Sequence, residues 1–163
     1  MTDQQTNERI EGIRSYLGMW RELRDRTGAK GADGMIMTAD YILENADVFA
    51  GRVLPSEYRM GEIKMCFKNA AELALADPSL TYHEGYAVGR AGIPVLHAWC
   101  VDEDGGVVDP TWPTDGADPT EWTYLGCGFQ TDFVCRVLVE KETWGVLDSP
   151  LVYENDASDS CAD

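Results

Sequence analysis

Three short runs of β-branched and aromatic residues follow one another between Leu80 and Trp112. They read LTYHEGYAV, IPVLHAWCV and GGVVDPTW, and the short loops GRAG and DEDGG separate them. Each run has the length and composition of a strand, and loops this short join antiparallel neighbours. The segment therefore predicts a β-meander, which is the strongest constraint on the fold.

Helical patterns lie on both sides of this meander. Apolar residues recur at intervals of three and four near the start of the chain, and alanine and leucine dominate the segment that ends at Asp77-Pro78. A further short strand, WTYLGCGF, and a last helix follow the meander, whereas the glycine-rich segment 27–34 predicts a turn. The predicted helices cover residues 6–26, the first part of 35–54, 66–76 and 131–141.

These elements predict an α+β fold in which helices pack on an antiparallel sheet of three to five strands. With 163 residues, of which 44% are hydrophobic, the chain is long enough for one domain with its own core. We expect a single domain over residues 1–152. The acidic segment 153–163, which ends in ENDASDSCAD, is expected to be disordered.

The net charge of −16 is distributed unevenly. Residues 1–82 carry ten Lys and Arg against thirteen Asp and Glu, a balance of −3, and residues 83–163 carry three against sixteen, a balance of −13. The second half would repel a phosphate backbone, which argues against a nucleic-acid partner. A basic partner fits better, although acidic surfaces are also common in soluble proteins.

No apolar run is long enough to span a bilayer, and the first residues do not resemble a signal peptide, so we expect a cytoplasmic protein without a membrane partner. The five cysteines lack CxxC spacing, which argues against a disulfide framework and against a zinc site. Reduced thiols follow as the simpler interpretation, with no metal and no cofactor.

The polar residues of the meander indicate chemistry. Alternation places His97 and Trp99 on one face of their strand, and a loop closed by a Val101–Val107 pair would bring Asp109 diagonally opposite His97. At that separation, an imidazole–carboxylate hydrogen bond can form. A register shift of one residue would instead send Asp109 to the opposite face.

A histidine held by a carboxylate is suited to acid–base catalysis, and a cysteine thiol is the candidate source of its proton. Cys66 is expected in the first turn of the helix at 66–76, because Gly61 lets the chain bend before it. A helix N-terminus and a nearby imidazolium both favour the thiolate. Taken alone, Cys66 and His97 would more often be inert core residues, and an aspartate before proline is a common turn residue.

The motifs MCFKNA, YHEGYAVG and PVLHAWCVDEDGGVVDPTW, between Met65 and Trp112, resemble the core of the transglutaminase-like branch of the papain-like cysteine enzymes. In that family, a cysteine before an aromatic residue opens a helix, an HAW motif lies on a following strand, and a DPTW-like motif supplies an aspartate. The resemblance implies that Cys66 is the nucleophile, His97 the general base and acid, and Asp109 the orienting carboxylate.

The chain departs from the family pattern just before the cysteine. Family members often have a glutamine or another polar residue there for the oxyanion hole, whereas this chain has Lys64 and Met65. We therefore expect the Cys66 backbone N–H as one donor, and Tyr58 or Asn69 as the second. Two tryptophans, Trp99 and Trp112, are expected in the core or in the wall of the site, and His83 is expected on the surface.

The chemistry implied is acyl transfer through a thioester, on a protein or peptide substrate that is expected to be basic. Water as the acceptor would make the protein a peptidase, amidase or deamidase, and an amine would make it a transglutaminase. The alternative from another class is a non-catalytic acidic binding or decoy protein on the same fold. Small acidic proteins act in this way in conflicts between phages and bacteria, and the compact, tryptophan-rich chain has the look of a phage product.

Overall fold

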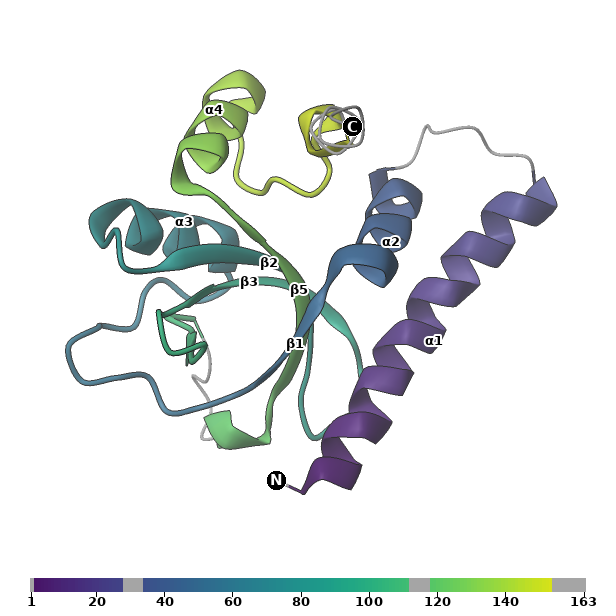
Figure 1. The fold of residues 1–163 in the computed structure, drawn as a ribbon, viewed down its shortest axis with the longest axis horizontal. Coiled ribbons are helices and arrows are strands. Elements are labelled where there is room, and N and C mark those ends of the chain that lie inside the picture. Colours follow the sequence, from purple (N-terminus) through teal and green to yellow (C-terminus); the bar gives the residue numbers. More distant parts are fainter. Residues whose placement is uncertain (1, 28–33, 112–117, 154–163) are drawn as a thin grey trace, which may run out of the picture.

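A computed structural model describes residues 2–27, 34–111 and 118–153 of the chain. Figure 1 shows a curled antiparallel sheet with helices around it, which confirms the α+β class. The helices are α1 (Asp3–Thr27), α2 (Gly34–Asn45), α3 (Cys66–Ala76) and α4 (Thr131–Lys141), with the short 3-10 helix η1 (Pro119–Glu121). The strands are β1 (Asp47–Ala50), β2 (Thr81–Val88), β3 (Val95–Val101), β4 (Val107–Val108) and β5 (Thr123–Phe129).

The sheet has the order β1-β5-β2-β3-β4, and every neighbouring pair is antiparallel. The predicted meander is β2-β3-β4, and the pairing of Val101 with Val107 follows the expected register. After β4 the chain returns to the far side of β2, where β5 pairs with both β2 and β1. The short strand β1 was not expected, because only four residues follow α2 in extended form.

Strand β3 is less central than its apolar sequence suggests. Its outer neighbour β4 has two residues, so the ladder on that edge ends at the pair Cys100–Val108. The first two residues of β3, Val95 and Leu96, are exposed, whereas Ala98 to Val101 are buried. Half of this strand therefore borders an opening at the edge of the sheet rather than the core.

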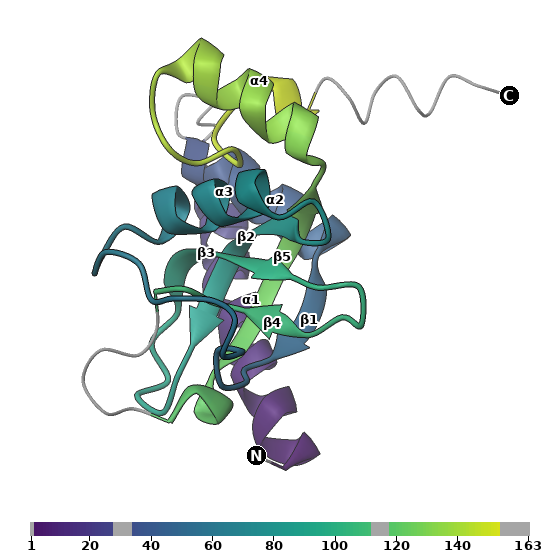
Figure 2. The same ribbon diagram turned by 90° about the vertical axis from the view of Figure 1, so that its left-hand side faces the viewer.

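Two buried clusters lie on the two faces of the sheet, because side chains alternate along each strand. The larger cluster joins the helices to one face through Ala70, Ala74, Ala98 and Cys100. Figure 2 shows α3 crossing that face above β2 and β3. The smaller cluster is formed around Trp99 and Tyr124 on the other face.

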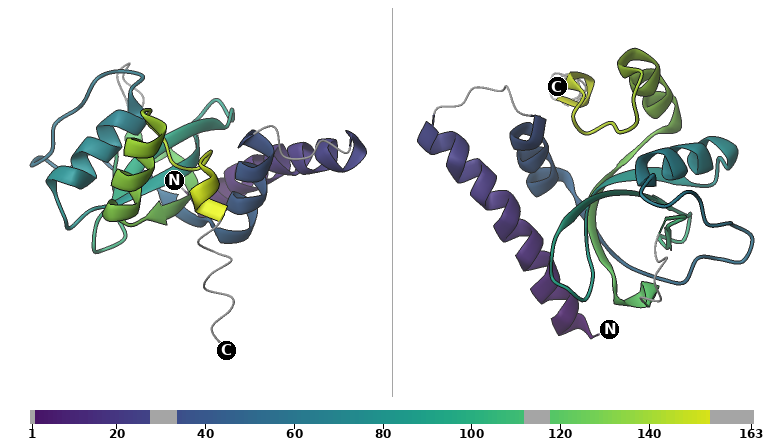
Figure 3. Two further views of the ribbon diagram at one scale, coloured as in Figure 1. Left: turned by 90° about the horizontal axis from the view of Figure 1, so that it is seen from above. Right: turned by 180° about the vertical axis from the view of Figure 1, so that it is seen from behind.

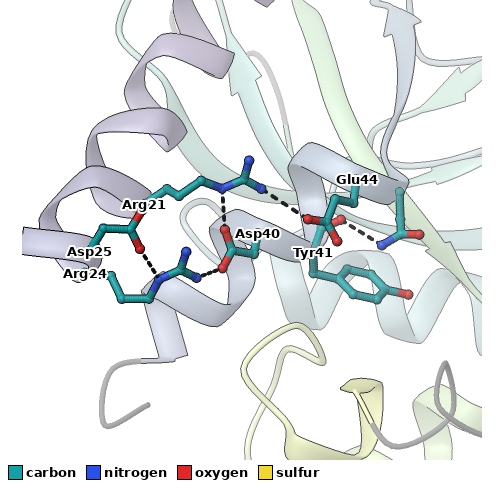
Figure 4. Close-up of polar contacts among 7 residues, drawn as sticks. Arg21, Arg24, Asp25, Asp40, Tyr41 and Glu44 are labelled. Atoms are coloured by element: carbon teal, nitrogen blue, oxygen red, sulfur yellow. Dashed lines mark hydrogen bonds and ion pairs between the residues drawn. The ribbon is translucent and has the colours of Figure 1, made fainter. Parts of the chain in front are cut away.

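Seen from above and from behind, α1 and α2 lie together at one side of the molecule, and α3 and α4 lie at the other (Figure 3). The Asp40 carboxylate of α2 accepts hydrogen bonds from Arg21 and Arg24 of α1, with 2.6 Å between Arg21 Nε and Asp40 Oδ1 (Figure 4). Glu44 extends this network by a contact to Arg21. These partly exposed pairs add little stability one by one, so the apolar contacts beneath them hold the helices together.

Among the described residues, no helix has the length and apolar character needed to cross a membrane. The predicted glycine-rich turn at 27–34 falls largely outside these residues, as does most of the acidic segment after 152. Tyr153, the first residue of that segment, is partly buried and donates its hydroxyl to Leu147 O.

Candidate active site

Cys66 is the first residue of α3, as the sequence predicts. The chain reaches it through Lys64, which has a positive φ of 67°, a conformation that costs free energy for any residue other than glycine. Met65 precedes the helix without a side-chain hydrogen bond that caps it, and the first intrahelical bond runs from Asn69 N to Met65 O. The backbone N–H groups of the first turn, from Cys66 to Lys68, therefore have no acceptor within the helix.

His97 and Asp109 meet as the pairing predicts. The distance from His97 Nε2 to Asp109 Oδ2 is 2.7 Å, and both side chains are buried. Asp109 directly follows β4, where the chain leaves the ladder and can approach the ring. This contact occupies one ring nitrogen and leaves Nδ1 for another partner.

The Cys66 side chain lies beside His97, whose hydrogen bond and charge lower the pKa of the thiol. The backbone of Ala98 and of Phe67 also lowers the pKa of this thiol, because N–H groups near the sulfur stabilise the thiolate. The backbone N–H groups of alternate residues in this part of the chain face β4, as the hydrogen bond from Asp102 N to Gly106 O shows. Because β4 pairs no farther than Cys100, the Ala98 N–H has no partner strand among the described residues and can face the sulfur. The short strand β4 thus makes room for the thiol.

The Asp109 carboxylate is fixed by two further hydrogen bonds. The Tyr124 hydroxyl donates to Oδ2 at 3.0 Å, and Thr111 N donates to Oδ1 at 2.9 Å. A carboxylate held on both oxygens keeps its orientation, and it keeps the imidazole ring in a single tautomer.

Asn69 joins the two segments that carry the thiol and the carboxylate. Its amide donates to Glu62 O at 2.7 Å and to Thr111 Oγ1 at 3.0 Å. Gly61 lies so close that a Cβ there would meet the Asn69 side chain at 2.4 Å, and its N–H donates to Pro110 O. Asn69 therefore positions the site, and both N–H groups of its amide are already engaged.

The environment shifts the pKa values of this pair in opposite directions. Burial alone would raise the pKa of the Cys66 thiol, but the hydrogen bond and charge of His97 lower it below its ordinary value of 9.0. Burial alone would lower the pKa of His97, but Asp109 and Cys66 raise it to about 9. A thiolate beside an imidazolium is the state that these shifts favour.

A cavity of about 440 Å³ opens over the pair, and it gives a substrate access to a ring that is 1% exposed. Its walls are largely apolar, with the cation of Lys64 at the edge. The lining residues are Ile63, Lys64, Cys66, Phe67, Val95, Leu96, His97 and Thr111.

The other predicted site residues lie elsewhere. Tyr58 donates its hydroxyl to Asp77 at 2.9 Å, which places it beyond the C-terminal end of α3, far along the helix from Cys66. Trp99 is fully buried and stacks on His97 with 6.3 Å between ring centroids, so it supports the ring from behind. Trp112 lies outside the described residues.

The prediction that His83 lies on the surface is wrong. The ring is 7% exposed, because it packs edge-on against Phe49 and stacks on Trp99. Alternation puts His83 on the face of the smaller cluster, and the chain folds over that face. The sequence around His83 could not reveal this cover, because β1 pairs at the far side of β5.

Tyr124 is the residue of the site that sequence reasoning missed. It lies on β5, two strands from β3, and its hydroxyl reaches Asp109 across the concave face of the curled sheet. Only the alternation of WTYLGCGF could have placed it on this face, and no local pattern gives the curvature.

Among the described residues, no group of three or more His, Cys, Asp or Glu side chains comes together in a way that could hold a metal ion. Comparisons with protein-family models, with curated proteins and with solved structures give no match to this chain.

Proposed function

We propose that this protein is a cysteine enzyme that transfers acyl groups from an amide bond, with Cys66 as nucleophile, His97 as acid and base, and Asp109 as the orienting carboxylate. One observation carries the proposal: a single buried imidazole is hydrogen-bonded to a fixed carboxylate and lies beside a helix N-terminal thiol whose pKa it lowers. A thiol, an imidazole and a carboxylate in this order are what a catalytic triad requires.

In the first half-reaction, the Cys66 thiolate attacks the amide carbonyl carbon. The C–N bond then breaks, the proton of the His97 imidazolium passes to the leaving amine, and a thioester remains on Cys66. In the second half-reaction, His97 takes a proton from water or from an amine, which attacks the thioester. The C–S bond breaks and releases the Cys66 thiolate beside the restored imidazolium. Water gives peptidase, amidase or deamidase activity, and an amine gives transglutaminase activity.

The oxyanion of the tetrahedral intermediate needs hydrogen-bond donors near the sulfur. The N-terminus of α3 supplies them in this proposal, because its first N–H groups are not capped by a side chain. The Cys66 N–H is the nearest, and the positive end of the helix adds a favourable potential. The proposal does not use Tyr58 or Asn69 as a donor to the oxyanion, because both side chains already donate hydrogen bonds to other groups.

The order of the elements supports a papain-like or transglutaminase-like core. The nucleophile begins a helix, and the histidine and aspartate follow on or after two adjacent strands that pack under it. The described cysteines, Cys66, Cys100, Cys127 and Cys135, are free thiols, which suits an enzyme that works in a reducing compartment such as the cytoplasm.

The experiment is site-resolved alkylation of the native protein with iodoacetamide near pH 7, read by peptide mass spectrometry. Cys66 should react about tenfold faster than Cys135, or more, because its pKa is lowered. Cys135 is the control for accessibility, since both thiols are partly buried. Cys100 should barely react, because burial raises its pKa to about 12.

Equal and slow labelling of every cysteine would refute the proposal and favour the non-catalytic acidic binder. If Cys66 is selectively reactive, incubation of the protein with a cell lysate identifies the reaction, and the Cys66→Ala variant serves as the blank. Cleavage adds water to the new ends, deamidation turns an amide into an acid, and cross-linking joins two chains with loss of ammonia, so mass spectrometry separates the three.

A further inference from the structure

A second cavity of about 480 Å³ adjoins the one over Cys66. Phe67 and Leu96 line both cavities, so they form the wall that the two share. The second cavity lies on the helix-covered face of the sheet, between the start of β3, α1 and the loop after α4. A substrate held at Cys66 therefore has a neighbouring space for one of its side chains.

The carboxylate of Glu84 lies in this second cavity and is 2% exposed. Its Oε2 accepts two short hydrogen bonds, from Val146 N at 2.7 Å and from the Tyr82 hydroxyl at 2.9 Å. Its Oε1 accepts one long bond, from Leu147 N at 3.3 Å. Because each carboxylate oxygen can accept about two hydrogen bonds, Oε1 has room for another donor.

No ion pair among the described residues includes Glu84. A buried carboxylate without a cation is costly, and burial raises the pKa of Glu84 to about 7. Lys141, at the end of α4, bonds with Asp148 and with Gly145 O rather than with Glu84. A cationic ligand would give the buried Glu84 carboxylate the charge partner that it lacks among the described residues.

The walls of the second cavity also suit a cation. Four aromatic residues line it, Tyr16, Phe67, Tyr86 and the 41% exposed Trp144. The faces of aromatic rings attract guanidinium and ammonium groups. Gly145 lies beside the Glu84 carboxylate and has a positive φ. A Cβ at this position would lie 3.5 Å from Oε1. The glycine therefore leaves the approach to Oε1 open.

The register of the sheet links this carboxylate to the proposed reaction centre. Glu84 of β2 pairs directly with Ala98 of β3, and the backbone of Ala98 contacts the Cys66 sulfur. Tyr86 pairs with Leu96, the residue of the shared wall. The two cavities thus lie beside the neighbouring strands β2 and β3, on either side of the wall formed by Phe67 and Leu96.

We infer that the cavity around Glu84 is a specificity pocket that binds a guanidinium or ammonium side chain of the substrate attacked by Cys66. This inference rests on the proposed function, whose substrate class it narrows to proteins or peptides with an arginine or lysine close to the reactive amide. The guanidinium or ammonium donates to Glu84 Oε1, and its methylene chain packs on Phe67 and Leu96.

The test compares two alkylating probes of similar length on the full chain, guanidinobutyl bromoacetamide and pentyl bromoacetamide. The charged probe should label Cys66 about tenfold faster than the neutral one, the factor expected of one charge-assisted hydrogen bond. In Glu84→Gln the ratio of the two rates should fall close to one. The matched control, Glu72→Gln on the exposed side of α3, should keep the ratio of the unaltered protein.

A ratio near one in the unaltered protein, with Cys66 still selectively labelled, would overturn the pocket and leave the proposed function intact. A ratio that survives Glu84→Gln, or rates that fall equally for both probes, would overturn the role of Glu84 in recognition.

A competition assay keeps the inference testable if Glu84→Gln fails to fold. Butylguanidine should slow labelling by the charged probe in the unaltered protein, and pentanol at the same concentration should not. Equal effects of the two competitors would overturn the inference. If no probe labels Cys66 selectively, the proposed function fails. Calorimetric titration of butylguanidine into Cys66→Ala protein then tests the pocket by itself, and the absence of binding would overturn it.

Discussion

The two histidines of the chain lie on either side of one tryptophan, and their surroundings give them opposite properties. His97 and His83 both stack on Trp99, with ring centroids 6.3 and 6.0 Å away, and both are buried. His97 bonds to the Asp109 carboxylate, whereas His83 Nδ1 bonds to the carbonyl oxygen of Thr81. The same residue type on the same face of one sheet thus has two different partners.

Their pKa values diverge accordingly. Burial lowers the pKa of His83 below 6.5, and its backbone partner and Asp47 do not restore it. Burial acts on His97 as well, but Asp109 and Cys66 outweigh it and raise the pKa of the ring to about 9. The comparison teaches that burial alone gives a neutral, structural histidine, and that a fixed carboxylate turns the same ring into a cation ready to donate a proton.

The largest expected difference between the two rings is in catalysis. His97→Gln should lower turnover of an amide substrate by about 10³-fold or more, because the acid and base of both half-reactions is lost. His83→Gln should change turnover only a few-fold and instead cost about 1 kcal/mol of stability through its lost packing. Turnover and the urea midpoint of both variants measure this contrast; similar losses of turnover would abolish it.

The next difference is in the pH titration of the two rings, observed by NMR. His97 should titrate near pH 9 and His83 below 6.5. Asp109→Asn should lower the midpoint of His97 toward that of His83, because the charge that stabilises the imidazolium is removed. An unchanged His97 midpoint in that variant would mean that another group holds the proton.

The same shifts fix the sign of the pH dependence of stability. Because the pKa of His97 is raised, protonation of its ring stabilises the folded state. This contribution to the free energy of unfolding is complete below pH 6.5 and is lost as the pH rises through about 9. The lowered pKa of His83 has the opposite consequence, since stability is lost as the pH falls below 6.5. Denaturant unfolding of Cys66→Ala protein, with and without His97→Gln, isolates the part of the first contribution that Asp109 supplies, because the thiol then neither titrates nor raises the pKa of His97.

The smallest expected effect comes from Tyr124→Phe. The change removes one hydrogen bond to Asp109 and leaves the bonds to His97 and Thr111 in place. We expect a loss of about 1 kcal/mol in the free energy of unfolding and a twofold to fivefold slower alkylation of Cys66. A loss as large as that of Asp109→Asn would show that the hydroxyl, rather than the carboxylate, sets the orientation of the ring.

Much of the site could be predicted because its residues lie in locally readable patterns. Cys66 starts an alanine-rich helix, and His97 and Asp109 flank a hairpin whose loop length fixes the Val101–Val107 pair. The second oxyanion donor could not be predicted in the same way. Asn69 and Tyr58 have suitable side chains, but their hydrogen bonds are decided by loops that pack on them from elsewhere in the chain.

Local periodicity, helix termini and hairpin length are properties of neighbouring residues, so the helices, the meander and the pairing of His97 with Asp109 can be predicted from the sequence. Contacts between distant segments depend on the curvature of the sheet and on which element covers each face. For that reason the burial of His83, the bond from Tyr124 to Asp109, and the position of Glu84 in a cavity beside Cys66 follow only from the folded structure.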